Sequence, residues 1–195
     1  MPQPILPEVE GLNEHQVATL TYCRGYKQFL SMLEGYRAGV CVFCKLDPVK
    51  NRVIRTATSG NMRWHMWVNP FPLPHTALHL ISAPVHHVAP GDLITLDDMT
   101  AKGELFLWAQ QEYKLTGGGV AMRFGSPFES SGTVLHLHEN IIVPSRTGVV
   151  EVTLAKEPSK IAEQIARLLV FLKLSRGVTS ADLTPEELAL IEGRV

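Results

Sequence analysis

Two histidines and an asparagine alternate along one apolar segment, Gly132 to Pro144, in the order His136, His138, Asn140. The β-branched and aliphatic residues around them favour a strand, which sends alternate side chains to one face. The three should therefore stand in a row, with neighbours roughly 7 Å apart. At that spacing two of them can share one phosphate or one metal neighbourhood. Spacing alone leaves open metal ligands, a nucleophile with a helper, or polar residues satisfied on a half-buried strand.

The cysteine pair in Cys41-Val42-Phe43-Cys44 is a second group that can do chemistry. In a reducing compartment this spacing indicates metal binding or redox chemistry before a structural disulfide. Structural zinc takes four nitrogen or sulfur ligands, and a second cysteine pair is absent, so histidines would supply the rest. A pair of ordinary buried thiols is the plainer alternative. The candidate histidines are His15, His65, His75, His79, His86, His87, His136 and His138.

These side chains need a framework, which the sequence predicts from strands interleaved with a few helices. The strands that we expect are 52–58, 62–68, 76–81, 120–124, 132–144 and 149–154. The helices that we expect are 14–37 with a break near residues 23–26, one capped by Thr95 and ended by Gly117 to Gly119, one from Pro158 to Gly177, and a short one capped by Thr184. Antiparallel strands with few helices indicate an α+β fold.

Composition limits the classes of function. The chain has 195 residues, 45% of them hydrophobic, which suits one compact domain, alone or with terminal additions. A net charge of -1 gives no global basic field of the kind that drives nucleic-acid binding. No apolar run approaches the roughly 20 residues that cross a bilayer, and the first residues lack the pattern of a signal peptide. We therefore expect no membrane partner and a cytoplasmic location.

The order of these pieces resembles the histidine triad (HIT) superfamily, which includes nucleotide hydrolases and, more distantly, galactose-1-phosphate uridylyltransferase and diadenosine-polyphosphate phosphorylases. The resemblance covers roughly residues 41 to 146. The segments that carry it are Cys41-Val42-Phe43-Cys44-Lys45, Asn69-Pro70-Phe71-Pro72, His79-Leu80-Ile81-Ser82-Ala83-Pro84-Val85-His86-His87-Val88, the helix near Thr95, and Gly132 to Pro144.

This resemblance implies a HIT-like fold, with an antiparallel sheet of about five strands flanked by helices, usually in a homodimer that binds a nucleotide or nucleoside phosphate derivative. It implies that His138 attacks the α-phosphorus to form a nucleotidyl-histidine, which water or another phosphate then resolves. A neutral imidazole is a competent nucleophile at pH 7. Asn69 and Phe71 match the loop beside the nucleoside in relatives and are assigned to binding.

The resemblance also implies a zinc site. In the zinc-bearing branches the ligands correspond here to Cys41, Cys44, His87 and His136, with His86 a nearby substitute for His87. We expect this Zn²⁺ to be structural, because a site closed by four protein ligands has no open position for substrate. It would fix the orientation of His136, and hence of His138.

This sequence departs from the family pattern at several positions. Asn140 stands where hydrolases have histidine and the transferase branch has glutamine; it can donate a hydrogen bond to phosphate but cannot exchange a proton at neutral pH. Glu139 replaces an apolar residue. Gly132 replaces a glutamine that touches phosphate, a contact that Ser130, Ser131 or Thr133 would have to replace. Arg123 and Arg146 are candidate phosphate partners, with a solvated surface arginine as the alternative for each.

Together these features predict an N-terminal segment and helix over residues 1–40, a HIT-like core over 41–155 and a C-terminal helical extension over 156–195. The predicted function is a nucleotide hydrolase or nucleotidyltransferase, with His138 and Asn140 catalytic and with Asn69, Phe71, Ser131 and Thr133 contacting the nucleotide. The alternative is a zinc-stapled HIT fold that binds a nucleotide or a protein without catalysis.

Overall fold

The computed structural model describes residues 5–46, 49, 51–89, 92–130, 132–152 and 158–192. The chain divides into two compact units: a helical unit of residues 1–41, 126–135 and 153–195, and a sheet unit of residues 42–125 and 136–152. The division into 1–40, 41–155 and 156–195 stays a prediction. Of the helices described, none is both long and apolar enough to span a membrane.

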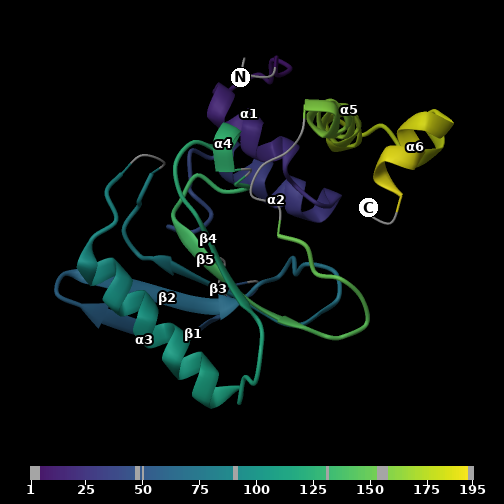
Figure 1. Ribbon diagram of the computed structural model, residues 1–195. Helices are drawn as coiled ribbons and strands as arrows, with labels where there is room; N and C mark the ends of the chain where they lie inside the picture. The colour runs from purple at the N-terminus through teal and green to yellow at the C-terminus, as the bar shows by residue number, and fades with distance from the viewer. Residues whose placement is uncertain are drawn as a thin grey trace. The chain divides into compact units, whose positions relative to one another are not determined.

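The sheet unit contains five antiparallel strands in the order β1-β2-β3-β5-β4 (Figure 1). The α+β class and the antiparallel sheet of five strands are therefore confirmed. The strands are β1 (Val53–Ser59), β2 (Met62–Val68), β3 (Thr76–Pro84), β4 (Gly119–Arg123) and β5 (His138–Pro144). The predicted hairpin between the first two strands is present, with Ser59 paired to Met62.

Helix α3 (Leu96–Glu112) packs across β1 and β2 on one face of the sheet (Figure 1). Its predicted capping box is present: Thr95 accepts from the backbone of Asp98, whose carboxylate accepts from Thr95 in return. Helix and sheet enclose one apolar core. Its buried members are Ala57, Trp64, Met66, Leu80, Val88, Ala101, Leu105, Ala109, Leu137 and Ile141.

The opposite face of the sheet carries a smaller apolar cluster. Trp67, Ile81 and Ala83 are buried there, and Phe43 and Leu46 pack against them. In the registers of β2 with β3 and of β3 with β5, Trp67 lies opposite Ile81 and Ile81 lies opposite Asn140. Since directly opposed residues share a face, His138 and Asn140 belong to this second face, away from α3.

The helical unit contains α1 (Glu14–Thr21), α2 (Tyr26–Arg37), α4 (Pro127–Ser130), α5 (Pro158–Ser175) and α6 (Pro185–Ile191), and a 3-10 turn at Ser180–Asp182. The break expected near residues 23–26 is present, and Gly25 is the N-cap residue of α2. The rings of Tyr26, Phe29 and Phe171 pack together with centroids 5.4 to 6.0 Å apart. Helix α4 was not predicted.

Two strand predictions need correction. Residues 132–137 form a bent loop, so the strand expected over 132–144 begins only at His138. The reason is the lack of partners: β4 ends at Arg123, opposite His138, and β3 ends at Pro84, which has no N–H to donate. In the strand expected over 149–154, residues 149–152 are irregular, and 153 and 154 lie outside the described residues.

Candidate functional site

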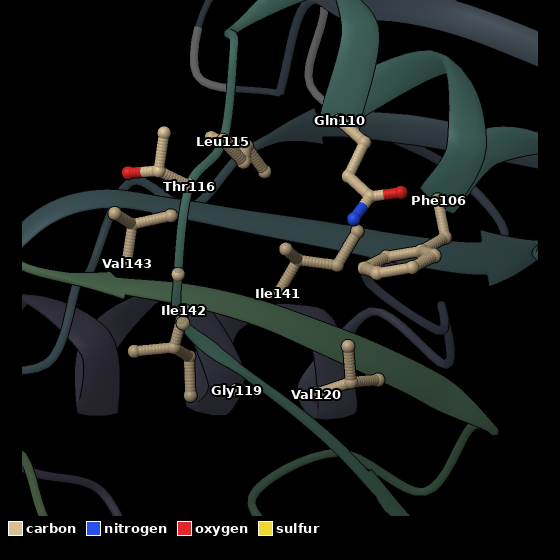
Figure 2. A pocket seen from close by; sticks show the side chains of 11 residues that line it. Phe106, Gln110, Leu115, Thr116, Gly119, Val120, Ile141, Ile142 and Val143 are labelled. Carbon is tan, nitrogen blue, oxygen red and sulfur yellow. The ribbon is translucent and has the colours of Figure 1, made fainter.

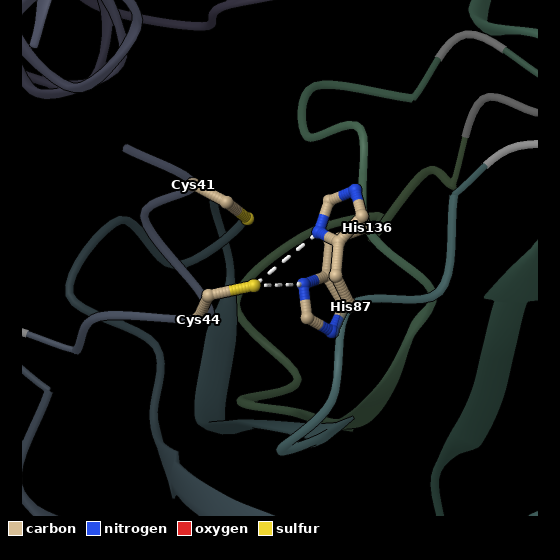
Figure 3. A group of neighbouring side chains, drawn as sticks. All are labelled: Cys41, Cys44, His87 and His136. Carbon is tan, nitrogen blue, oxygen red and sulfur yellow. Dashed lines mark hydrogen bonds between the residues drawn. The ribbon is translucent and has the colours of Figure 1, made fainter. Parts of the chain in front are cut away.

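Four sulfur and nitrogen side chains meet beside the start of β5. Cys41, Cys44, His87 and His136 each offer one ligand atom, and the four atoms all lie within 4.8 Å of one another. Figure 3 shows the thiol of Cys44 facing both imidazoles: its Sγ lies 3.3 Å from Nδ1 of His87 and 3.4 Å from Nδ1 of His136. His136 is buried, whereas Cys44 and His87 are exposed.

These four residues fit a zinc ion. Tetrahedral bonds of about 2.3 Å to sulfur and 2.0–2.1 Å to nitrogen place neighbouring S and N ligands about 3.6 Å apart. The observed separations of 3.3 and 3.4 Å need only a small expansion to accept the ion. A set of two thiols and two imidazoles matches the donor preference of zinc. The predicted ligands are therefore brought together, and the cluster could bind a metal.

A hydrogen bond from the second ring nitrogen of His136 determines which of the two nitrogens carries the proton. Nε2 lies 3.0 Å from the carbonyl oxygen of Pro84. A carbonyl only accepts, so Nε2 is protonated and Nδ1 turns its lone pair toward Cys44. Burial, with repulsion from His87, lowers the pKa of His136 to about 4, so the ring is neutral at pH 7. A metal-ligating histidine is oriented by this kind of hydrogen bond.

The backbone of His136 holds the next histidine. Nδ1 of His138 donates to the carbonyl oxygen of His136 over 2.8 Å, so Nε2 of His138 carries the lone pair. His138 is buried, at 5% exposure. The ring of Phe43 meets it edge-on, with centroids 5.1 Å apart at 81°. The two histidines are thus neighbours with different chemical environments, although only His138 lies in the strand.

Asn140 belongs to a buried network with His79, which the sequence indicated only as one of several candidate metal ligands. Nε2 of His79, on β3, lies 2.9 Å from Oδ1 of Asn140, and Nδ1 of His79 accepts from the backbone N–H of Leu73 at 3.1 Å. The Nδ2 of Asn140 donates to the carbonyl of Ala121 at 3.4 Å. The contact follows from strand geometry: His79 lies on the same face of β3 as Ile81, and Ile81 is paired with Asn140 of β5.

Asn69 and Phe71, the expected nucleoside contacts, form a local turn. Oδ1 of Asn69 accepts from the backbone N–H of Phe71 at 2.8 Å. The backbone N–H of Asn69 donates to the backbone carbonyl oxygen of His79 at 2.8 Å. Asn69 is 7% exposed, whereas Phe71 is half-buried. Of the two residues, Phe71 therefore has the side-chain surface that could meet a ligand.

For the other residues predicted to contact the nucleotide or its phosphate, the structure gives position and exposure. Ser131 lies outside the described residues, and Thr133 is half-buried in the 132–137 loop. Arg146 is exposed on the turn after β5 with a φ of 64°. Arg123 is half-buried on β4, directly opposite His138 in the strand register.

Glu139 points to the face of α3, away from both of its neighbours. It is fully buried and pairs with Lys102 of α3. Burial raises the pKa of Glu139, and the ammonium of Lys102 opposes that rise. The hydroxyl of Ser82, opposite Glu139 in the β3–β5 pair, also acts against that rise through a side-chain hydrogen bond. An acidic residue therefore stands at this apolar position because α3 supplies a cation.

A small pocket opens between α3 and the far end of β4 and β5. It holds about 210 Å³ and is lined by Phe106, Gln110, Leu115, Thr116, the three glycines 117–119, Val120, Ile141, Ile142 and Val143 (Figure 2). Its volume is below the roughly 300 Å³ at which small-molecule sites begin, and none of the site histidines lines it.

Comparison with known proteins gives structural likenesses. No protein-family model matches the chain, and no curated protein matches it. The structure is similar to a zinc-bound histidine triad family protein from Mycobacterium smegmatis, at 19% identity over 69% of this chain and 96% of that one, with a TM-score of 0.38.

It is also similar to a histidine triad nucleotide-binding protein from Candida albicans, at 17% identity over 70% of this chain and 98% of that one, TM-score 0.41. A third similar structure is a diadenosine triphosphate hydrolase from Plasmodium falciparum, at 14% identity over 64% of this chain and 78% of that one, TM-score 0.35. The chain is thus structurally similar to histidine triad proteins at low sequence identity.

Proposed function

We propose that the protein hydrolyses or transfers a nucleoside phosphate derivative through a nucleotidyl group carried on His138. The observation that carries this proposal is the hydrogen bond from Nδ1 of His138 to the carbonyl oxygen of His136. It selects the tautomer in which Nε2 is the nucleophile. The same carbonyl dipole stabilises the positive charge that the ring acquires when Nε2 bonds to phosphorus.

The nucleotide contacts of this proposal are Phe71, Asn69, Thr133 and Ser131. Phe71 offers a partly exposed aromatic ring to a nucleoside, and the buried Asn69 holds the turn that presents it. Asn140 supports the reaction as a hydrogen-bond donor to a phosphate oxygen. Its Oδ1 accepts from His79 and one N–H donates to the carbonyl of Ala121, which leaves the second N–H of the amide for a phosphate oxygen.

In this proposal Cys41, Cys44, His87 and His136 hold a structural Zn²⁺. The ion would neutralise the cysteine thiolates and pin the loop that ends at His136. Since the carbonyl of His136 orients His138, a fixed loop gives the nucleophile a fixed direction. A homodimer, predicted from the family resemblance, is tested by light scattering of the full chain.

The decisive experiment is a screen of nucleoside polyphosphates, phosphoramidates and nucleotide sugars, with His138→Ala as the test variant. The unmodified protein should turn over at least one of these classes, and a nucleotidylated peptide containing His138 should appear in an acid-free quench analysed by mass spectrometry. His138→Ala should lose both signals while the fold, followed by circular dichroism, is retained. Undiminished turnover in that variant rules out the mechanism.

A second candidate function is a binding module without catalysis. The observation that favours it is the buried Asn140, whose amide oxygen and amide nitrogen both make hydrogen bonds within the protein. This alternative predicts nucleotide binding by calorimetry with no adduct on His138 and no turnover of any class in the screen. The adduct measurement therefore separates the two functions.

A further inference from the structure

The face of the sheet that carries His138 also carries a cation. Arg123 of β4 is the Cα partner of His138 in the antiparallel β4–β5 pair. Directly opposed residues of such a pair share a face, with Cβ atoms about 4.5–5.5 Å apart. Its neighbour on that face is Ala121, opposite Asn140, which has only a methyl group. A long cationic side chain thus stands beside the proposed nucleophile and next to a short residue.

The imidazoles of His79 and His136, on the same side of the sheet, each donate a proton to a protein acceptor. The Nε2–H of His79 goes to Asn140, and Nδ1 of His79 is occupied by the backbone N–H of Leu73. The Nε2–H of His136 goes to Pro84. Passing either proton to a leaving group would break that hydrogen bond and leave a buried acceptor without its donor.

Neither Asn140 nor Arg123 can replace a proton donor. An amide does not release a proton at neutral pH, and a guanidinium keeps its protons under all ordinary conditions. Burial lowers the pKa of Arg123, but an arginine stays charged from so high a starting value. Arginine is nevertheless well suited to phosphate, because its planar donors match two phosphate oxygens at once.

We propose that Arg123 is a catalytic residue of this site, which binds the negative charge on the α-phosphate as His138 attacks, and that the site selects leaving groups that depart as stable anions. This inference rests on the proposed function of His138. It assigns the permanent positive charge to β4, across the strand pair from the nucleophile. The third residue of the row His136, His138 and Asn140 is an uncharged amide.

The two steps balance without a proton donor. The lone pair of Nε2 forms the N–P bond while the P–O bond to the leaving group breaks, and that electron pair leaves on the oxygen. The proton on Nδ1 of His138 stays there, hydrogen-bonded to the carbonyl oxygen of His136. Water then attacks phosphorus, the P–N pair returns to Nε2, and one proton from the water passes to the solvent. Phosphates and acidic phenols can leave in this way, whereas amines and alkoxides cannot.

The test uses a series of adenosine monophosphate aryl esters that differ only in the phenol, from para-nitrophenol to unsubstituted phenol, with the corresponding guanosine esters run in parallel. The kcat/KM of the unmodified full chain should fall steeply as the phenol becomes less acidic. Arg123→Gln should lower kcat/KM by about 10²–10³-fold, the usual cost of one lost donor to a developing oxyanion. Arg123→Lys should recover part of the loss.

A structural defect would lower every ester by the same factor, whereas loss of charge stabilisation makes the dependence on phenol acidity steeper in Arg123→Gln. The matched control is Arg63→Gln, an exposed arginine on β2, three strands from β4, which should leave kcat/KM unchanged. A flat dependence in the unmodified protein, or normal rates in Arg123→Gln while His138→Ala is inactive, overturns this inference alone. Activity retained in His138→Ala overturns the proposed function and this inference together.

Discussion

Nε2 of His79 on β3 donates a hydrogen bond to Oδ1 of Asn140 on β5 over 2.9 Å, inside a network that is buried on both sides. The two residues lie 61 positions apart in the chain and meet because both point to the sheet face opposite α3. The contact fixes the orientation of the asparagine amide, which sequence alone leaves undetermined.

Replacing Asn140 by aspartate should be tolerated better than replacing it by leucine. Both variants lose the amide N–H that donates to Ala121, but aspartate keeps an acceptor for the Nε2–H of His79. Asn140→Leu leaves that donor buried and unpaired at a further cost of about 1–3 kcal/mol. Urea denaturation of both variants measures the difference. Equal stability of the two would mean that the hydrogen bond contributes nothing to folding.

The cysteine and histidine cluster should bind one zinc ion per chain. Metal analysis of the purified protein should find this stoichiometry, and Cys44→Ser should reduce it strongly, because one of four ligands is lost. Cys23→Ala is the matched control, since Cys23 is a buried thiol outside the cluster. A stable protein that contains no metal when isolated with zinc present would refute the site.

Asp98 should make stability fall in acid. Its burial raises the pKa, but hydrogen bonds from the Trp64 indole and from Thr95 outweigh that effect and lower the pKa below the usual 3.8. Because the folded-state pKa is depressed, the stabilisation is complete above about pH 4 and is lost as pH falls through the lower folded value.

Asp98→Asn should therefore flatten the decline in urea midpoint between pH 5 and pH 3. At pH 7 it should cost about 1–2 kcal/mol, because the carboxylate both closes the capping box of α3 and accepts from the buried Trp64 at 2.9 Å. Glu104→Gln, an exposed change on the same helix, should leave the urea midpoint at pH 7 unchanged. An unaltered slope in Asp98→Asn would contradict this assignment.

The glycine turn before β4 should tolerate substitution at one position and not at the next. A Cβ on Gly118 would lie 2.6 Å from the carbonyl oxygen of Ile142, and its φ of +150° is unfavourable for any side chain. Gly118→Ala should cost about 1–3 kcal/mol. Gly117→Ala, whose Cβ would meet nothing within 4 Å, is the control. Thermal unfolding of the two variants should differ clearly.

Local signals predicted the framework well. The capping boxes at Thr95 and Thr184, the hairpin turn after Ser59 and the break at Gly25 depend on residues a few positions apart, so their structures could be predicted from the sequence. The strand expected from Gly132 failed because a strand also needs partners, and these end at Arg123 and Pro84. The residue pattern of one segment does not show where its partner strands end.

The site was predicted in part for the same reason. The four candidate metal ligands could be selected through the family resemblance, and the structure brings their ligand atoms together. The hydrogen bond between His79 and Asn140, and the position of Arg123 opposite His138, depend on strand register across long chain separations. Alternation predicts a face, but only the register says which side chains share it.

The ion pair of Lys102 with Glu139 should be costly to break and cheap to replace. Lys102→Met would leave a fully buried carboxylate without its cation, which destabilises by about 3–5 kcal/mol. Without the ammonium the pKa of Glu139 would rise further, so Lys102→Met should regain stability as pH falls, when the buried carboxyl is protonated.

The double variant Lys102→Met with Glu139→Leu restores an apolar contact between α3 and β5 and should be close to the unmodified protein, or more stable. A double-mutant cycle in urea measures the coupling, and additive losses in the double variant would show that the pair does not act as a unit.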